Sequence, residues 1–296
     1  MTDHTYPLTR PLLIALKAAK DAGRAVLDVY KQDFDVWYKE DRSPLTTADK
    51  FSHKIIVDHL NDPSIKSFPI LSEEGKDIPF EQRCSWKYFW LVDPLDGTKE
   101  FIKRNGEFTV NIALIFQHRP VLGVIYAPVK KYFYFASNDI GAYRLQYNNA
   151  DERLYDMIVD GDADEVLSTL LKRSDKLPCA DMRLEISDSR LIIVGSRSHP
   201  STEFEAFVES MKHKYAKVEV VSSGSSLKLC MVAEGGADIY PRLGPTMEWD
   251  TAAGHAVVEQ ANGSVVNYET GEPLEYNKKN LLNPWFIVKV QDIRRC

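Results

Sequence analysis

The segment Trp90-Leu91-Val92-Asp93-Pro94-Leu95-Asp96-Gly97-Thr98 tells most about the fold of this chain. Its apolar start, residues 89–92, predicts a buried strand, and two aspartates follow at the carboxyl end, where open α/β sheets hold ligands. Pro94 restricts the turn, and Gly97 lets a phosphate approach the backbone closely. The amides after Gly97 would begin a helix, whose N-terminus favours anions. The turn therefore combines candidate ligands for a cation with donors for a phosphate.

The same turn also has a purely structural explanation, because Asp-Gly is a common turn pair. Two further acidic segments favour function: Ser72-Glu73-Glu74-Gly75 follows an apolar run, and Glu248-Trp249-Asp250-Thr251 stands at a predicted helix start. Mg²⁺ needs only a few carboxylates, because it keeps several waters and takes the rest of its oxygens from a substrate phosphate. The three segments together predict a magnesium site.

Composition restricts the class of partner. The chain has 296 residues, 44% of them hydrophobic, which suffices for two modest domains or one large one. A net charge of -6 argues against a nucleic acid polymer or an anionic membrane as partner, and no apolar run is long enough to span a membrane. The sequence does not indicate an oligomeric state.

Cysteine usage and the N-terminus indicate a cytoplasmic protein. The four cysteines are far apart and form no Cys-x-x-Cys pair, so we expect neither a zinc site nor a disulfide framework. The first ten residues are polar and lack the apolar core of a secretory signal. The cysteines are Cys84, Cys179, Cys230 and Cys296.

Apolar periodicity predicts two dissimilar halves. Residues 1–138 read as an α+β metal-binding domain, with helices over 9–31 and from Thr46 onward, then an antiparallel meander of three strands. Residues 139–190 have a looser pattern and are expected to connect the halves. From Leu191 to residue 296, short strands alternate with helices, which predicts an α/β substrate domain.

The motifs in order resemble a known family over nearly the whole chain. Asp93 to Thr98, Ser72 to Glu74 and Trp249 to Gly254 resemble the inositol monophosphatase superfamily of metal-dependent phosphatases. Residues 99–111 and 244–246 are similar to its CysQ group, the 3'(2'),5'-bisphosphate nucleotidases. The resemblance implies a layered αβαβα sandwich of the sugar-phosphatase type.

The resemblance also implies roles for individual residues. Two or three Mg²⁺ ions would be held by the side chains or carbonyl of Glu73, Asp93, Leu95, Asp96 and Asp250. Glu74 is left out, because neighbours in an extended chain point to opposite sides. Asp49 and Thr98 match the pair that orients the attacking water. Without the resemblance, Asp49 would be explained as a helix cap.

Substrate contacts are expected mainly from the second half. Those implied are Gly97, Thr98, Ser196, His199, Gly224, Lys228 and Asp250. A polar loop or a solvated lysine would explain the same residues without a substrate, and Arg242 could equally lie on the surface. Lys99, Lys103 and Arg104 form a basic cluster that could attract a doubly phosphorylated substrate, although helix lysines are usually solvated. Met247 departs from the small or polar residue that the motif usually has.

The implied reaction is Mg²⁺-dependent hydrolysis of the 3'-phosphate of adenosine 3',5'-bisphosphate, giving AMP and phosphate without a phospho-enzyme. 3'-Phosphoadenylyl sulfate is a related candidate substrate, and lithium is expected to inhibit. The alternatives are a phosphatase of the same superfamily acting on inositol phosphates or fructose 1,6-bisphosphate, and a nucleotide-binding sensor without turnover. The complete set of acidic residues argues against the sensor.

Overall fold

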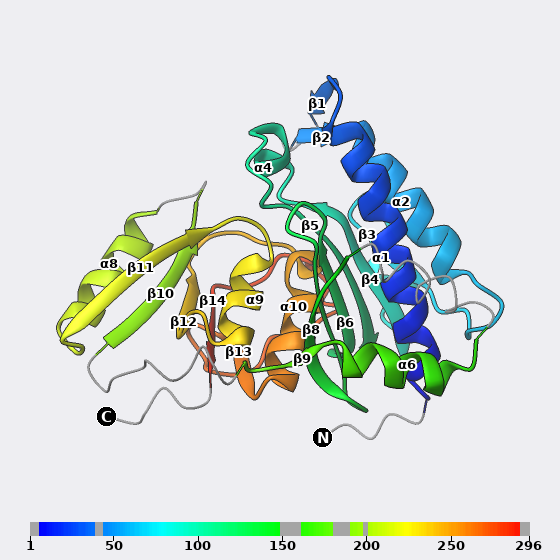
Figure 1. The fold of residues 1–296 in the computed structure, drawn as a ribbon. Helices are drawn as coiled ribbons and strands as arrows, with labels where there is room; N and C mark the ends of the chain where they lie inside the picture. The colour runs from blue at the N-terminus through cyan, green and yellow to red at the C-terminus, as the bar shows by residue number, and fades with distance from the viewer. Residues whose placement is uncertain (1–5, 39–43, 149–160, 180–189, 198–200, 291–296) are drawn as a thin grey trace.

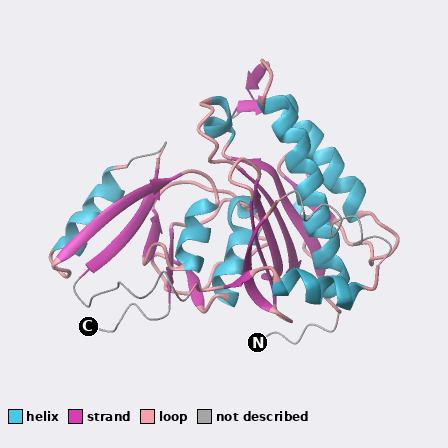
Figure 2. Cartoon of the chain, viewed as in Figure 1, coloured by secondary structure: helices cyan, strands magenta, loops and turns pink. Residues whose placement is uncertain are grey.

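The computed structural model describes residues 6–38, 44–148, 161–179, 190–197 and 201–290. A seven-stranded and a five-stranded β-sheet alternate with helices in an αβαβα arrangement (Figure 1). Figure 2 shows the two sheets in magenta, separated by helices in cyan. The arrangement confirms the layered sandwich that the sequence predicts.

The large sheet contains the buried strand of the opening motif. That strand, β4, runs parallel to β3 and antiparallel to β5, and the sheet then continues as an antiparallel meander. Its spatial order follows the chain: β3 (Ile70–Ser72), β4 (Tyr88–Asp96), β5 (Thr109–Phe116), β6 (Arg119–Ala127), β7 (Tyr132–Ser137), β8 (Gly141–Gln146) and β9 (Asp175–Lys176). The predicted meander over residues 108–136 is therefore confirmed.

Two long helices cover the outer face of this sheet (Figure 1). α1 (Thr9–Tyr30) turns its apolar stripe inward, with Leu12, Leu16 and Ala19 fully buried. α2 (Thr47–Leu60) lies beside it and follows a hairpin of β1 (Val36–Tyr38) and β2 (Pro44–Thr46). The short helices α3 (Phe80–Arg83) and α4 (Thr98–Ile102) lie on either side of β4 in the chain.

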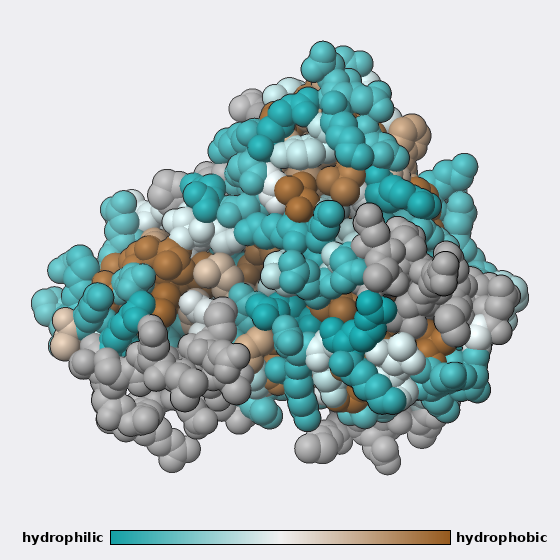
Figure 3. Space-filling model, in the orientation of Figure 1, coloured by the Kyte–Doolittle hydropathy of each residue, from teal (hydrophilic) through white to brown (hydrophobic). Residues whose placement is uncertain are grey.

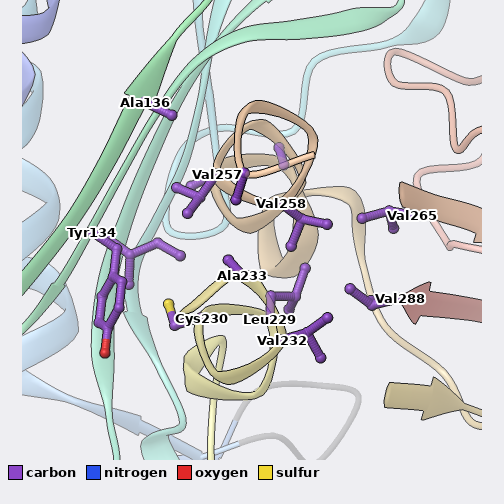
Figure 4. Packing of buried hydrophobic residues seen from close by; sticks show 14 of the residues in the cluster. Tyr134, Ala136, Leu229, Cys230, Val232, Ala233, Val257, Val258, Val265 and Val288 are labelled. Atoms are coloured by element: carbon purple, nitrogen blue, oxygen red, sulfur yellow. The ribbon is translucent and has the colours of Figure 1, made fainter. Parts of the chain in front are cut away.

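Two helices form the middle layer: α9 (Leu227–Glu234) and α10 (Glu248–Gln260). Figure 4 shows Leu229 and Val232 of α9 near Val288, while Val257 of α10 faces the strand that carries Ala136. α10 approaches β6 so closely that a Cβ on Gly123 would lie 2.3 Å from the Ala253 carbonyl oxygen. The glycine thus sets the distance between this helix and the large sheet.

The small sheet has the spatial order β11-β10-β12-β14-β13 and supports the second half. Its strands are β10 (Arg190–Ser196), β11 (Lys217–Ser223), β12 (Ile239–Arg242), β13 (Gly263–Asn267) and β14 (Phe286–Val290). α8 (Thr202–Lys212) packs its Phe207 and Val208 against Leu191 and Ile193 on the outer face. The five strands agree with those predicted after residue 190.

The described parts of residues 139–190 differ from the expected connecting segment. β8 extends the large sheet directly beyond β7. α6 (Ala163–Lys172) buries Val166 and Leu170 in the core that lies under α1. A boundary at residue 138 would cut through one sheet, so these elements belong structurally to the first half. The sequence pattern misses this because β8 is only partly buried and therefore less apolar.

In the parts of the chain that the structure describes, no helix has the length and apolarity needed to cross a bilayer. The face drawn in Figure 3 is mainly hydrophilic, with separate hydrophobic patches.

Candidate active site

A cavity of about 250 Å³ lies where the carboxyl end of β4 meets residues of the second half. It brings together most of the residues that the sequence selects, although they are far apart in the chain. Among the predicted residues, its lining includes Glu73, Asp93, Leu95, Asp96, Gly97, Thr98, Ser196, Gly224, Lys228 and Asp250. The cavity therefore joins the acidic residues of the first half to Asp250 and the predicted substrate contacts of the second half.

The turn after β4 is held in shape by local hydrogen bonds. The pairing of β4 with β5 shifts register between Asp93 and Asp96, so the strand is irregular where its acids begin. The Leu95 amide donates to Asp93 Oδ1 at 3.1 Å, and the Ser52 hydroxyl donates to the Pro94 carbonyl at 2.6 Å. Gly97 has φ +86°, a conformation that favours glycine, and α4 begins at the next residue.

The acidic cluster consists of Glu73, Asp93, Asp96 and Asp250. Asp93 is 1% exposed, and its pKa is raised well above the ordinary value by burial, then by the negative charges of Glu73, Asp96 and Asp250. Burial likewise raises the pKa of Asp250, with the charges of Asp96 and Glu73 adding to the effect. The Met247 amide opposes it by donating to Asp250 Oδ2 at 2.9 Å. The negative charges of the cluster thus make Asp93 and Asp250 harder to ionise.

This donor set fits a divalent cation, because carboxylates that repel one another around the buried Asp93 are stabilised by positive charge placed among them. The fit rests on the chemistry of the donors and on their shared cavity. Among the described residues, no three His, Cys, Asp or Glu side chains are gathered closely enough to surround one ion. Met247, which departs from the usual motif, acts here through its backbone, so its side chain does not alter how Asp250 is held.

Asp49 lies beside this cluster, where it caps a helix and also contacts Thr98. Its Oδ2 accepts the Thr46 amide and hydroxyl, each at 2.7 Å, which is the capping arrangement. Its Oδ1 accepts the Thr98 hydroxyl at 3.5 Å, a long contact, while Thr98 also reaches the Leu95 carbonyl at 3.2 Å. Burial raises the pKa of Asp49 to about 6. Capping and contact with Thr98 are therefore compatible.

The second half contributes a buried lysine to the cavity. Lys228 is 6% exposed, donates to the Ser225 carbonyl, and lies 5.5 Å from the centre of the Tyr240 ring. Burial lowers its pKa to about 8, against the raising effect of Asp96. Arg242 also lines the cavity and donates to the Pro245 carbonyl at 2.8 Å. Neither is a freely solvated surface side chain, whereas His199 lies outside the described residues.

In the structure, Arg104 and Lys99 of the predicted basic cluster lie in different places. Arg104 turns to the first helix, where its guanidinium donates to the carbonyls of Tyr30 and Gln32 and lies over the Tyr30 ring. Lys99 lines the cavity. The donors of Arg104 thus fix the end of α1, and its attraction of substrate stays a prediction.

A glutamate missed by the sequence reasoning joins the two halves at the cavity. Glu107 accepts the Gly224 amide at 2.9 Å and both Arg197 Nε at 2.8 Å and Nη2 at 3.1 Å. Burial alone would raise the pKa of Glu107, but the hydrogen bonds from Arg197 and Gly224 bring it below the ordinary value. A Cβ on Gly224 would lie 2.6 Å from Glu100 Cγ, so this junction requires glycine.

Glu107→Gln is expected to destabilise the protein by on the order of 1 kcal/mol at pH 7, because it removes the charge that Arg197 and Gly224 contact. The lowered pKa means that this contribution is complete above the unfolded pKa of about 4.3 and is lost as pH falls through the folded pKa. The difference in Tm between variant and native protein should therefore be nearly constant from pH 7 to about pH 5 and shrink as the pH falls from about 5 to about 3. A difference that stays constant below about pH 5 would contradict this.

The sequence reasoning also missed a polar cluster around Asp96, formed by Thr109, Asn111, Ser225 and Ser226. Thr109 and Asn111 are two residues apart on β5 and so share a face. Alternation of polar residues in an otherwise apolar strand is the signal that could have identified them. Nothing in the sequence shows that they meet the two serines more than a hundred positions later.

Known proteins are similar to this chain in both sequence and fold. A model of the inositol monophosphatase family matches residues 9–289. The 3'(2'),5'-bisphosphate nucleotidase CysQ of Escherichia coli K12 is 41% identical over 278 residues, covering 92% of this chain and 96% of that protein. The 3'(2'),5'-bisphosphate nucleotidase CysQ of Haemophilus influenzae is 34% identical over 290 residues, covering 97% of this chain and 94% of that protein. The crystal structure of CysQ from Bacteroides thetaiotaomicron matches with a TM-score of 0.81 and 47% identity, covering 95% of this chain and 97% of that one.

Proposed function

This chain belongs to the inositol monophosphatase family, and we propose that it is a Mg²⁺-dependent 3'(2'),5'-bisphosphate nucleotidase. It would remove the 3'-phosphate of adenosine 3',5'-bisphosphate to give AMP and phosphate. The observation that carries the proposal is one cavity lined by the four carboxylates of the acidic cluster, by the buried Lys228 and by Arg242. Its relatives named as this nucleotidase match over more than nine-tenths of the chain.

The residues that would hold two or three Mg²⁺ ions are Glu73, Asp93, Asp96 and Asp250, with the Leu95 carbonyl. When bound, the cations supply positive charge beside the phosphate and make water more acidic. The carboxylates support this role because they line one cavity, and because the charges of their neighbours help to raise the pKa of Asp93 and of Asp250. A neutral carbonyl completes the set without adding negative charge beside the phosphate.

Asp49 and Thr98 would orient the attacking water. The Thr98 hydroxyl contacts both Asp49 Oδ1 and the Leu95 carbonyl. Its oxygen therefore lies beside the acidic cluster and next to the Asp49 carboxylate. In the reaction, the water oxygen bonds to phosphorus, the bond from phosphorus to the ribose oxygen breaks, and that oxygen takes up a proton. No residue of the chain becomes phosphorylated.

Residues of the second half would bind the rest of the nucleotide. Lys228 and Arg242 bring positive charge to the cavity, and Ser196 and Gly224 also line it. A substrate with a second phosphate would gain more from these cations than a simple sugar phosphate, since the lysine is buried and its charge is little screened. His199 remains a predicted contact.

A phosphate-release panel tests the function. Adenosine 3',5'-bisphosphate, 3'-phosphoadenylyl sulfate, inositol 1-phosphate and fructose 1,6-bisphosphate are compared with Mg²⁺ present, absent, or in competition with Li⁺. We expect the highest kcat/KM for adenosine 3',5'-bisphosphate, no turnover without Mg²⁺, and inhibition by Li⁺. Preference for the inositol or fructose substrate would reassign the enzyme within the family, and binding without phosphate release would identify a sensor.

Thr98→Ala is expected to lower kcat about a hundredfold, because the hydroxyl that orients the water is lost. The Mg²⁺ concentration for half-maximal rate should change less than about threefold, since no carboxylate is removed. Thr98→Ser keeps the hydroxyl and serves as the matched variant, with most of the rate retained. Loss of Mg²⁺ affinity at an unchanged saturated rate would reject the proposed role.

A further inference from the structure

Asp96 uses its two carboxylate oxygens differently. Its Oδ2 accepts the Ser225 hydroxyl at 2.6 Å, the Ser226 amide at 2.6 Å and the Asn111 side-chain amide at 3.3 Å. Its Oδ1 accepts no hydrogen bond from the residues that the structure describes. Three donors occupy one oxygen, so the other is the one left for a cation.

A second layer holds these donors in place. The Ser226 hydroxyl donates to Asn111 Oδ1 at 2.9 Å, and the Thr109 hydroxyl lies 3.0 Å from the same atom. Because Asn111 Oδ1 faces two hydroxyls, its amide nitrogen must face Asp96; the reversed orientation would bring two acceptor oxygens together. Thr109, Asn111 and Ser226 are each at most 1% exposed, so solvent cannot replace these bonds.

Ser225 has the most constrained backbone of the residues in this hydrogen-bond network. Its φ is +55°, in the left-handed region that a serine rarely occupies and that costs on the order of 1 kcal/mol. Its hydroxyl bonds to Asp96 and also lies 2.6 Å from the Thr109 hydroxyl, while its carbonyl accepts Lys228 Nζ. The surrounding contacts therefore hold it in a conformation that its own backbone disfavours.

We propose that Ser225, supported by Thr109, Asn111 and Ser226, is a positioning residue that fixes Asp96 with Oδ2 hydrogen-bonded and Oδ1 free to bind the cation. The inference rests on the proposed function only in taking Asp96 as a ligand of the metal. The second half thus contributes to the metal site in two ways: Asp250 is a ligand, and Ser225 and Ser226 orient Asp96. Partners that orient a metal ligand commonly change metal affinity 10- to 100-fold when removed.

The test measures binding of Mg²⁺ alone by isothermal titration calorimetry, on the full chain, with Tm recorded for each variant. Ser225→Gly removes the hydroxyl and accommodates the positive φ, while Thr109→Val leaves residue 225 unchanged and so controls for the added backbone freedom of glycine. We expect Ser225→Gly to bind Mg²⁺ about tenfold more weakly.

Thr109→Val should also weaken Mg²⁺ binding, while Thr109→Ser should bind Mg²⁺ as the native protein does. Ser210→Ala removes a serine hydroxyl from α8, where it donates to the Phe207 carbonyl, and should bind as the native protein does.

The outcomes separate the two proposals. If Ser225→Gly and Thr109→Val lose stability but bind Mg²⁺ like the native protein, the network is only a structural link between the halves and the inference is overturned. If the variants lose Mg²⁺ affinity while the native protein prefers another phosphate ester, the inference stands and the substrate assignment falls. If the native protein binds no Mg²⁺, both fall.

Discussion

Asp96→Asn is expected to lower kcat/KM by at least about a thousandfold, equivalent to about 4 kcal/mol of activation free energy. Asp96 Oδ2 accepts three donors, from Asn111, Ser225 and Ser226. An asparagine can satisfy them only with its single oxygen, which turns its NH₂ group toward the place where the cation would bind. The substitution keeps the shape of the side chain but presents donors to a positive ion.

The measurements are phosphate release at saturating Mg²⁺, Mg²⁺ binding by calorimetry, and Tm. We expect turnover and metal affinity to fall together, while Tm stays within a few degrees because the hydrogen bonds to Oδ2 are kept. Asp164→Asn is the matched control, since Asp164 lies in the exposed first turn of α6. Near-normal Mg²⁺-dependent hydrolysis by Asp96→Asn would refute the metal assignment.

Gly123→Ala is expected to destabilise the protein by about 3 kcal/mol and to lower Tm by about 5–10 °C. The added Cβ would lie 2.3 Å from the Ala253 carbonyl oxygen and 2.8 Å from Ala256 Cβ, so α10 or β6 must move. The nearest atoms are the Ala253 backbone and the Ala256 Cβ, so no flexible side chain can give way. Because Asp250 lies in the first turn of α10, the displacement should also raise the Mg²⁺ concentration for half-maximal rate.

Gly244→Ala controls for the loss of glycine, since a Cβ there meets no atom within 4 Å. Thermal unfolding of both variants, followed by circular dichroism, is the measurement. We expect Gly244→Ala to melt near the native protein. If Gly123→Ala does the same, the close approach of α10 to the sheet does not limit stability, and the account of the middle layer is wrong.

Burial and periodicity explain why much of the fold was predictable. α1 and the strands of the meander have long apolar patterns, because each turns one or two faces to a core, and their residue types reflect that directly. The acidic residues were identifiable for a related reason, since charged side chains directly after buried strands are costly unless they have a function or a partner. β8 and α6 were misassigned because their patterns are shorter and partly exposed.

The local sequence was enough to specify the secondary structure around β4, the acidic character of its turn and the need for glycine at residue 97. Tertiary packing specified the rest of the site. It brings Ser225 against Asp96, 129 residues away, turns Arg104 toward α1, and joins Glu107 to Gly224 across the two halves. These contacts depend on strand register and on the distance between layers, which side-chain types do not encode locally. Hydrogen bonds a few ångströms long form only once the layers have packed.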